Sequence, residues 1–88
     1  MVERKNIMNK IEETIENVEK LLTEKEALLN ATQTIKRANN ATKSEIQLLG
    51  NAIKSLQTHI KTLNDVLKIL KLIQIIIIDE DVNEDPTN

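Results

Sequence analysis

Few side chains of this sequence could do chemistry. His59 is the only histidine among 88 residues, and there is no cysteine. A metal ligand or general base at His59 would need a neighbouring carboxylate or second ligand at helical spacing, and none is present. The carboxylates of Glu12, Glu13, Glu16 and Glu19 spread over outward positions of a helical repeat, whereas general acid–base catalysis by a carboxyl pair needs one buried member. There is also no Gly-rich phosphate loop. We therefore predict that the protein is not an enzyme and holds no cofactor or metal.

Two weaker patterns concern binding and modification. Lys54, Lys61 and Lys68 recur every seven residues and form a basic line that could contact phosphates. No arginine cluster or aromatic side chain accompanies the line, so we interpret it as a solvated helix face. Residues 30–32 and 40–42 match the glycosylation acceptor pattern. Because no apolar signal core is visible at the N-terminus, we interpret both matches as chance and predict an intracellular protein.

Composition indicates an elongated helical protein. The chain has no aromatic residue, one Gly and one Pro, and 30% of its residues are charged. Compact sheet domains use aromatics and Gly-rich turns, whereas coiled coils have this composition. The net charge of −2 is unevenly distributed, with an acidic start, a basic middle and an acidic end. A helical chain of this length buries little surface alone, so we expect a protein partner, either itself or another coiled-coil subunit.

A seven-residue repeat gives the strongest signal. With Ile46 at position a and Leu49 at position d, both positions are apolar through four heptads, and the same phase continues back to the N-terminus. Polar residues, among them Lys25 and Thr32, interrupt it in the first half of the chain. We predict that these positions form the oligomerisation interface: Ile11, Val18, Leu21, Leu28, Ile35, Ile46, Leu49, Ile53, Leu56, Ile60, Leu63, Leu67 and Leu70.

The polar middle of the chain allows two architectures. In the first, the chain turns at residues 38–43, because Thr42 and Glu45 match a capping box and Asn39 and Asn40 tolerate the left-handed conformation of a helix stop. In the second, one long coiled-coil helix continues through this region, as the unbroken phase suggests. A further apolar column widens the stripe of the first half toward that of a bundle helix; it consists of Met8, Ile15, Leu22 and Leu29. We favour an antiparallel hairpin with helices over residues 3–37 and 44–74.

The C-terminal part is apolar on nearly all sides. Residues 66–78 are too few and include too many charges for a membrane span. The four consecutive isoleucines are β-branched and suit a helix poorly, and the acids that follow would lie unfavourably at a helix C-terminus. We therefore predict an extended segment at 75–78 and a disordered acidic tail at 79–88. The residues expected to touch a partner here are Ile73, Ile75, Ile76, Ile77 and Ile78.

These observations predict an all-α protein with a non-catalytic role. We expect a coiled-coil oligomerisation or scaffold module, or a small subunit of a helical complex, because the apolar stripes are too wide for one hairpin to cover. Two alternatives remain. One is a peripheral membrane protein that uses residues 66–78 on anionic lipid, and the other is a nucleic-acid-binding helical dimer that uses the lysine line.

Overall fold

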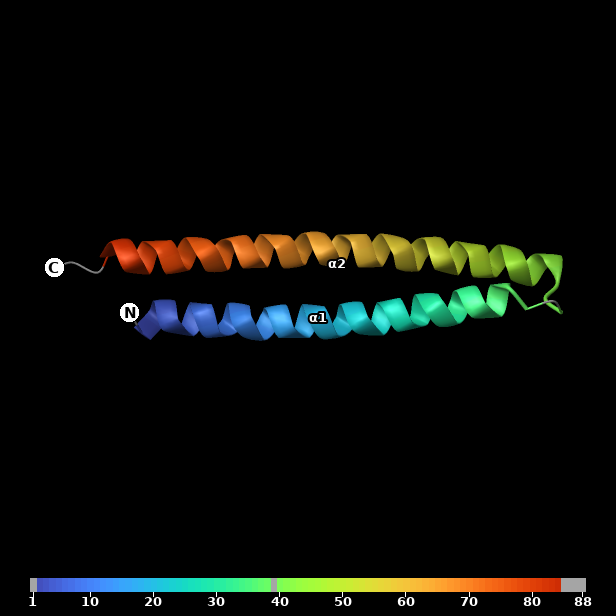
Figure 1. Ribbon diagram of the computed structural model, residues 1–88, viewed down its shortest axis with the longest axis horizontal. Helices are drawn as coiled ribbons and strands as arrows, with labels where there is room; N and C mark the ends of the chain where they lie inside the picture. The colour runs from blue at the N-terminus through green and yellow to red at the C-terminus, as the bar shows by residue number, and fades with distance from the viewer. Residues whose placement is uncertain (1, 39, 85–88) are drawn as a thin grey trace.

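The chain folds into a long antiparallel helical hairpin. The computed structural model describes the backbone of residues 2–38 and 40–84 and the side chains of residues 5–38 and 40–79. Helix α1 (Val2–Lys36) and helix α2 (Lys43–Glu84) lie side by side, with the turn at one end and the start of α1 and the end of α2 at the other (Figure 1). The molecule measures 71 × 15 × 14 Å. The predicted all-α hairpin is therefore confirmed, and the single continuous helix is wrong.

The turn depends on local hydrogen bonds. Near the end of α1, Ala38 N–H donates to the Ile35 carbonyl at 3.0 Å, which tightens the last turn. At the start of α2, Thr42 N–H donates to Glu45 Oε1 at 2.7 Å and Glu45 N–H donates to Thr42 Oγ1 at 3.2 Å. These two bonds form a capping box at the residues where the sequence predicts one. Asn40 is not left-handed, because no described non-glycine residue has a positive φ; Asn39 lies outside the described residues.

The C-terminal part of α2 differs from the prediction. The helix continues through residues 75–78 to Glu84, so the predicted extended segment and the predicted disorder of residues 79–84 are wrong. Residues 85–88 lie outside the described residues. Isoleucine lowers helix propensity by only a few tenths of a kcal/mol, and helices in proteins are stabilised mainly by packing. Ile77 is 9% exposed against α1, so packing outweighs the local preference.

The two helices meet along one apolar seam. α2 supplies its predicted a and d positions, which are half-buried: Leu49, Ile53, Leu56, Ile60, Leu63, Leu67 and Leu70. α1 supplies Met8, Ile11, Ile15, Val18, Leu22, Lys25, Leu29 and Thr32. The most buried described side chains, Ile15, Leu22 and Ile77, are still 8–9% exposed, and none of the described side chains is fully buried. The hairpin therefore has a seam but no closed core.

Candidate association surface

The seam of the hairpin uses a different column of α1 from the one predicted for the oligomerisation interface. Leu21, Leu28 and Ile35, which belong to the predicted column, are 40%, 53% and 55% exposed and lie outside the seam. The seam instead contains the neighbouring column that includes Leu22. That column is apolar at every step from Met8 to Leu29, whereas the exposed column is interrupted by Thr14 in the same stretch, so this rotation of α1 buries more apolar surface there. The buried column was visible in the sequence as the feature that widened the stripe. Ile46, also predicted in the interface, is exposed near the turn.

One side of the hairpin is polar. Lys71 Nζ of α2 lies 3.9 Å from Glu19 Oε2 of α1, and the ammonium of Lys36 lies beside Gly50. Both side chains of the ion pair are about half exposed, so solvent screens their attraction. The lysine line of α2 occupies the column next to Lys71 and is also exposed. We call this the polar side of the hairpin.

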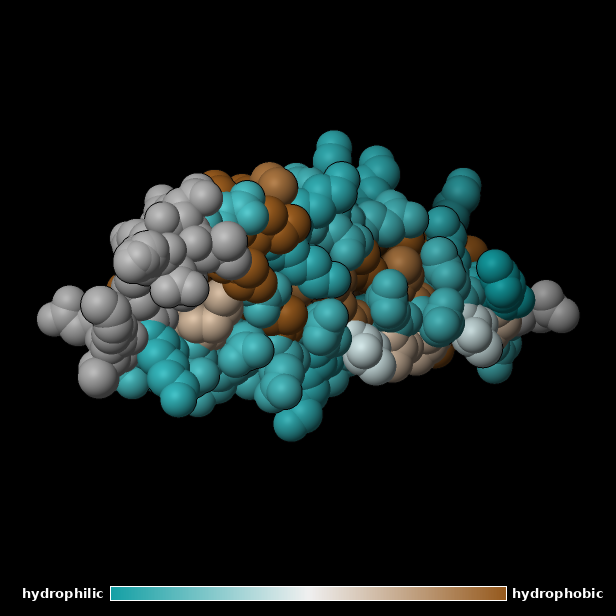
Figure 2. All heavy atoms as spheres, turned by 60° about the vertical axis from the view of Figure 1, so that its left-hand side comes forward, coloured by the Kyte–Doolittle hydropathy of each residue, from teal (hydrophilic) through white to brown (hydrophobic). Residues whose placement is uncertain are grey.

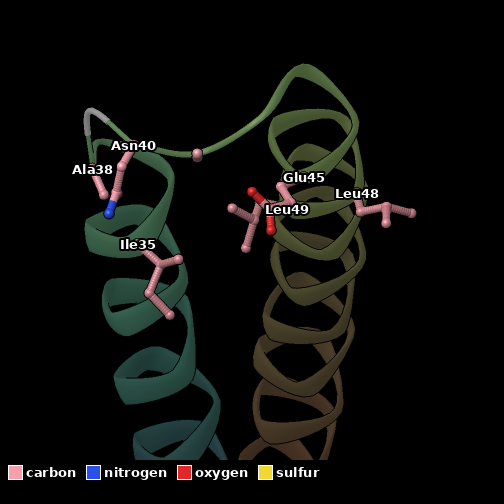
Figure 3. A pocket seen from close by; sticks show the side chains of 7 residues that line it. Ile35, Ala38, Asn40, Glu45, Leu48 and Leu49 are labelled. Atoms are coloured by element: carbon pink, nitrogen blue, oxygen red, sulfur yellow. The ribbon is translucent and has the colours of Figure 1, made fainter.

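The opposite side carries a groove beside the turn. Ile35 of α1 points toward α2, and Glu45 and Leu49 of α2 point back toward α1 (Figure 3). Leu48 also lines this groove but points outward, away from α1. In an antiparallel pair, the same flanking column of each helix lies on the same side of the seam. Ile35 and Leu48 line the same groove, so the columns that begin at these two residues continue along one side of the molecule.

Those columns form an exposed apolar surface that spans both helices. We call it the outer apolar face and define it by Ile7, Leu21, Leu28 and Ile35 of α1 and Leu48, Val66, Ile69, Ile73 and Ile76 of α2. Every one of these side chains is exposed in the hairpin. In Figure 2, apolar side chains gather near the end of the hairpin where α2 finishes and continue in patches along the molecule between polar ones. The face thus extends beyond any single pocket.

The isoleucines predicted to touch a partner divide between three environments. Ile77 is buried in the seam, which leaves it unable to reach another molecule. Ile73 and Ile76 lie on the outer apolar face. Ile75 and Ile78 are also exposed, but their positions in the repeat place them toward the polar side. The outer apolar face is therefore continuous with an apolar end of α2.

The ionisable side chains that the sequence analysis considered for chemistry are exposed in the hairpin. The Thr42 backbone N–H, and then its hydroxyl, hold the pKa of Glu45 below its usual value of 4.5 by stabilising the carboxylate. A carboxyl pKa lowered by folding adds stability above its unfolded pKa, and this is lost as pH falls through the folded pKa. His59 is exposed. Within the described residues, no group of three or more His, Asp or Glu side chains could hold a metal ion.

The fold and this surface define the molecule as a helical hairpin with one uncovered apolar face. None of the described helical stretches is both long and apolar enough to cross a membrane. Comparison of the chain with protein-family models, with curated proteins and with solved structures found no match.

Proposed function

We propose that this chain is a non-catalytic association module that joins helical protein chains, as an oligomerisation or scaffold element or as a small subunit of a helical complex. The outer apolar face supports this proposal. It combines large aliphatic side chains from both helices on one side of the seam, and all of them are exposed in the isolated hairpin. Large exposed apolar patches rimmed by polar side chains commonly mark protein–protein interaction sites.

The energetics favour a partner along the whole face. Fully burying one Val, Leu or Ile side chain contributes about 1.5–3 kcal/mol. The seam alone buries few side chains well, since only Ile15, Leu22 and Ile77 are below one-tenth exposed among the described residues. Covering the outer apolar face therefore supplies stabilisation that the hairpin lacks. A helical partner suits it because helix packing requires a long apolar stripe of this kind.

The test is made in an extract of the cells that produce the protein. The full chain, fused to a monomeric fluorescent protein, is analysed by size-exclusion chromatography with fluorescence detection. We expect the fusion to elute as an assembly, and Leu21→Glu with Leu28→Glu to shift it to the monomer position, because each charge would be buried without a partner. Thr23→Glu with Asn30→Glu is the matched control on an exposed, outward column of the same helix. A wild-type fusion that elutes as a monomer would contradict the proposal.

A further inference from the structure

We propose that the partner of the outer apolar face is a second copy of this chain. Two hairpins would lie face to face, with their turns at the same end, to form a closed four-helix bundle. This inference rests on the proposed function and specifies its partner. Three properties of the face favour a second copy over an unrelated chain: its dimensions, the area that it leaves exposed, and the order of large and small side chains along it.

The dimensions of the face fit another hairpin. On α1 the face extends from Ile7 to Ile35, and on α2 from Leu48 to Ile76. Each stretch is roughly 42 Å long at the usual rise of an α-helix. A second copy offers two helices of the same length, so each column of the face can lie against a helix of the partner.

The exposed area is that of an incomplete domain. The chain has 6819 Å² of accessible surface for a mass of 10.0 kDa. A compact monomer of that mass exposes about 5,200 Å². The difference is about 1,600 Å² per chain and therefore about 3,200 Å² for two chains, which lies within the range of roughly 2,000–5,000 Å² that obligate dimers bury in total. One two-fold interface is therefore sufficient to remove the excess.

The face is complementary to itself. Ile35 and Leu48 line the same groove, so the two columns begin at the same height beside the turn. From there both repeat every seven residues toward the end of the hairpin that holds the chain termini. The next layers hold Leu28 with Ser55, Leu21 with Thr62, Thr14 with Ile69, and finally Ile7 with Ile76. In these two columns each of the three middle layers thus has one large and one small side chain. Val66 and Ile73, also on the face, belong to the column of α2 that lies between the seam and the Leu48 column, together with Ala52 and His59.

A two-fold axis parallel to the helices brings the large side chains of one copy against the small side chains of the other. It places α1 of one copy on α2 of the other, so that Leu21 faces Thr62 of the second copy and Thr14 faces Ile69. Large then meets small in every middle layer, as interdigitating layers require, and a two-fold interface needs a surface that is complementary to itself. The Thr14 hydroxyl already donates to the Lys10 carbonyl of its own helix at 2.7 Å, so covering it leaves no donor unpaired.

The first measurement is the mass of the purified full chain by light scattering, with helicity by circular dichroism. We expect a discrete species of about twice the chain mass of 10.0 kDa. Leu21→Glu with Leu28→Glu should halve that mass, and Thr23→Glu with Asn30→Glu should leave it unchanged. If the glutamate pair loses its helices, Leu21→Gln with Leu28→Gln replaces it. A wild-type monomer, or an assembly of more than two chains, overturns the inference.

The second measurement fixes the arrangement. The chain has no cysteine, so Ala38→Cys gives a single site for a spin label beside the turn. We expect a label-to-label distance below about 30 Å, because neighbouring helices in a bundle lie 8–10 Å apart. A distance close to the 71 Å length of the hairpin would overturn the placement of α1 on the partner's α2.

The two proposals fail in different ways. If the purified chain is a monomer while the fusion assembles in the cell extract, the partner is another protein: the second copy is excluded and the association function stands. If both are monomeric, both proposals fail. If the purified chain is a dimer whose mass does not respond to the glutamate pair, the outer apolar face is not the interface.

Discussion

Helices α1 and α2 differ in which apolar side chains remain exposed outside the seam. α2 turns one stripe toward α1 from Leu49 to Ile77, and its additional exposed isoleucines gather at its C-terminal part. α1 has two apolar columns side by side and buries only the unbroken one. Leu22 is 8% exposed while its neighbour Leu21 is 40% exposed. A seam between two helices thus buries only one column of a wide apolar stripe, and the second column stays available to another molecule.

Substitution of Leu22, compared with substitution of Leu21, should give the largest change in the free energy of unfolding. Leu22→Ala should lower the free energy of unfolding by about 2–4 kcal/mol at every chain concentration, because it opens a cavity in the seam. Leu21→Ala should destabilise strongly only at concentrations where chains associate. Urea unfolding monitored by circular dichroism at two chain concentrations tests this. Losses from Leu21→Ala that do not depend on concentration would contradict the assignment of Leu21 to an interface between molecules.

Replacing a polar residue of α1 inside the seam should give the next largest change in the free energy of unfolding. Lys25 is half-buried between Leu22 and Leu29, whereas Lys20 is exposed. Lys25→Leu should raise the free energy of unfolding by about 1 kcal/mol, since it replaces a partly desolvated amine with apolar surface. Lys20→Leu, the matched control, should give no comparable gain. Chemical unfolding of both variants measures the difference, and equal responses would show that α1 is not rotated as described.

The cap of α2 should have an effect of similar or smaller size. Thr42→Ala removes the hydroxyl that accepts from Glu45 N–H, and we expect a loss of about 1 kcal/mol. Thr58→Ala is the control, because the Thr58 hydroxyl donates to the Lys54 carbonyl inside the helix and Ala has the higher helix propensity. Thermal unfolding should separate the two variants. Equal stability would mean that the turn does not depend on this cap.

The ion pair between Glu19 and Lys71 should have the smallest effect. It forms only when α1 is rotated as observed, so it reports on that rotation even though it contributes little. A double-mutant cycle of Glu19→Gln and Lys71→Gln should give a coupling of about 0.2–0.5 kcal/mol, because both side chains are about half exposed. The coupling should decrease in high salt. A coupling of zero at low salt would argue against this contact in solution.

Much of the architecture follows from local sequence. Thr42 and Glu45 determine where α2 starts, and the unbroken a and d positions of α2 determine which stripe it buries. The rotation of α1 was not predicted, because its two candidate columns share the same a positions, including Lys25, and differ only at neighbouring steps. The choice depends on the total apolar area that meets α2, which is a property of the pair.

The end of α2 was also not predicted, because it depends on packing against α1. Local preferences of β-branched residues predicted an extended segment at residues 75–78, but the seam holds Ile77 and keeps the helix continuous. The outer apolar face was equally hidden, because its columns become neighbours only once the chain turns. Leu21, Leu28 and Ile35 form one column of the repeat in the sequence, and only the packed hairpin shows that this column lies outside the seam.

The most direct test of the account compares thiol labelling at two exposed positions of α1. Leu28 and Asn30 are both exposed in the hairpin, on the outer apolar face and on an outward column respectively, and the chain has no natural cysteine. The account predicts that Leu28→Cys labels much more slowly than Asn30→Cys at high chain concentration and that dilution removes the difference. Equal labelling rates at high concentration would show that the outer apolar face is uncovered in solution, and would contradict the central claim.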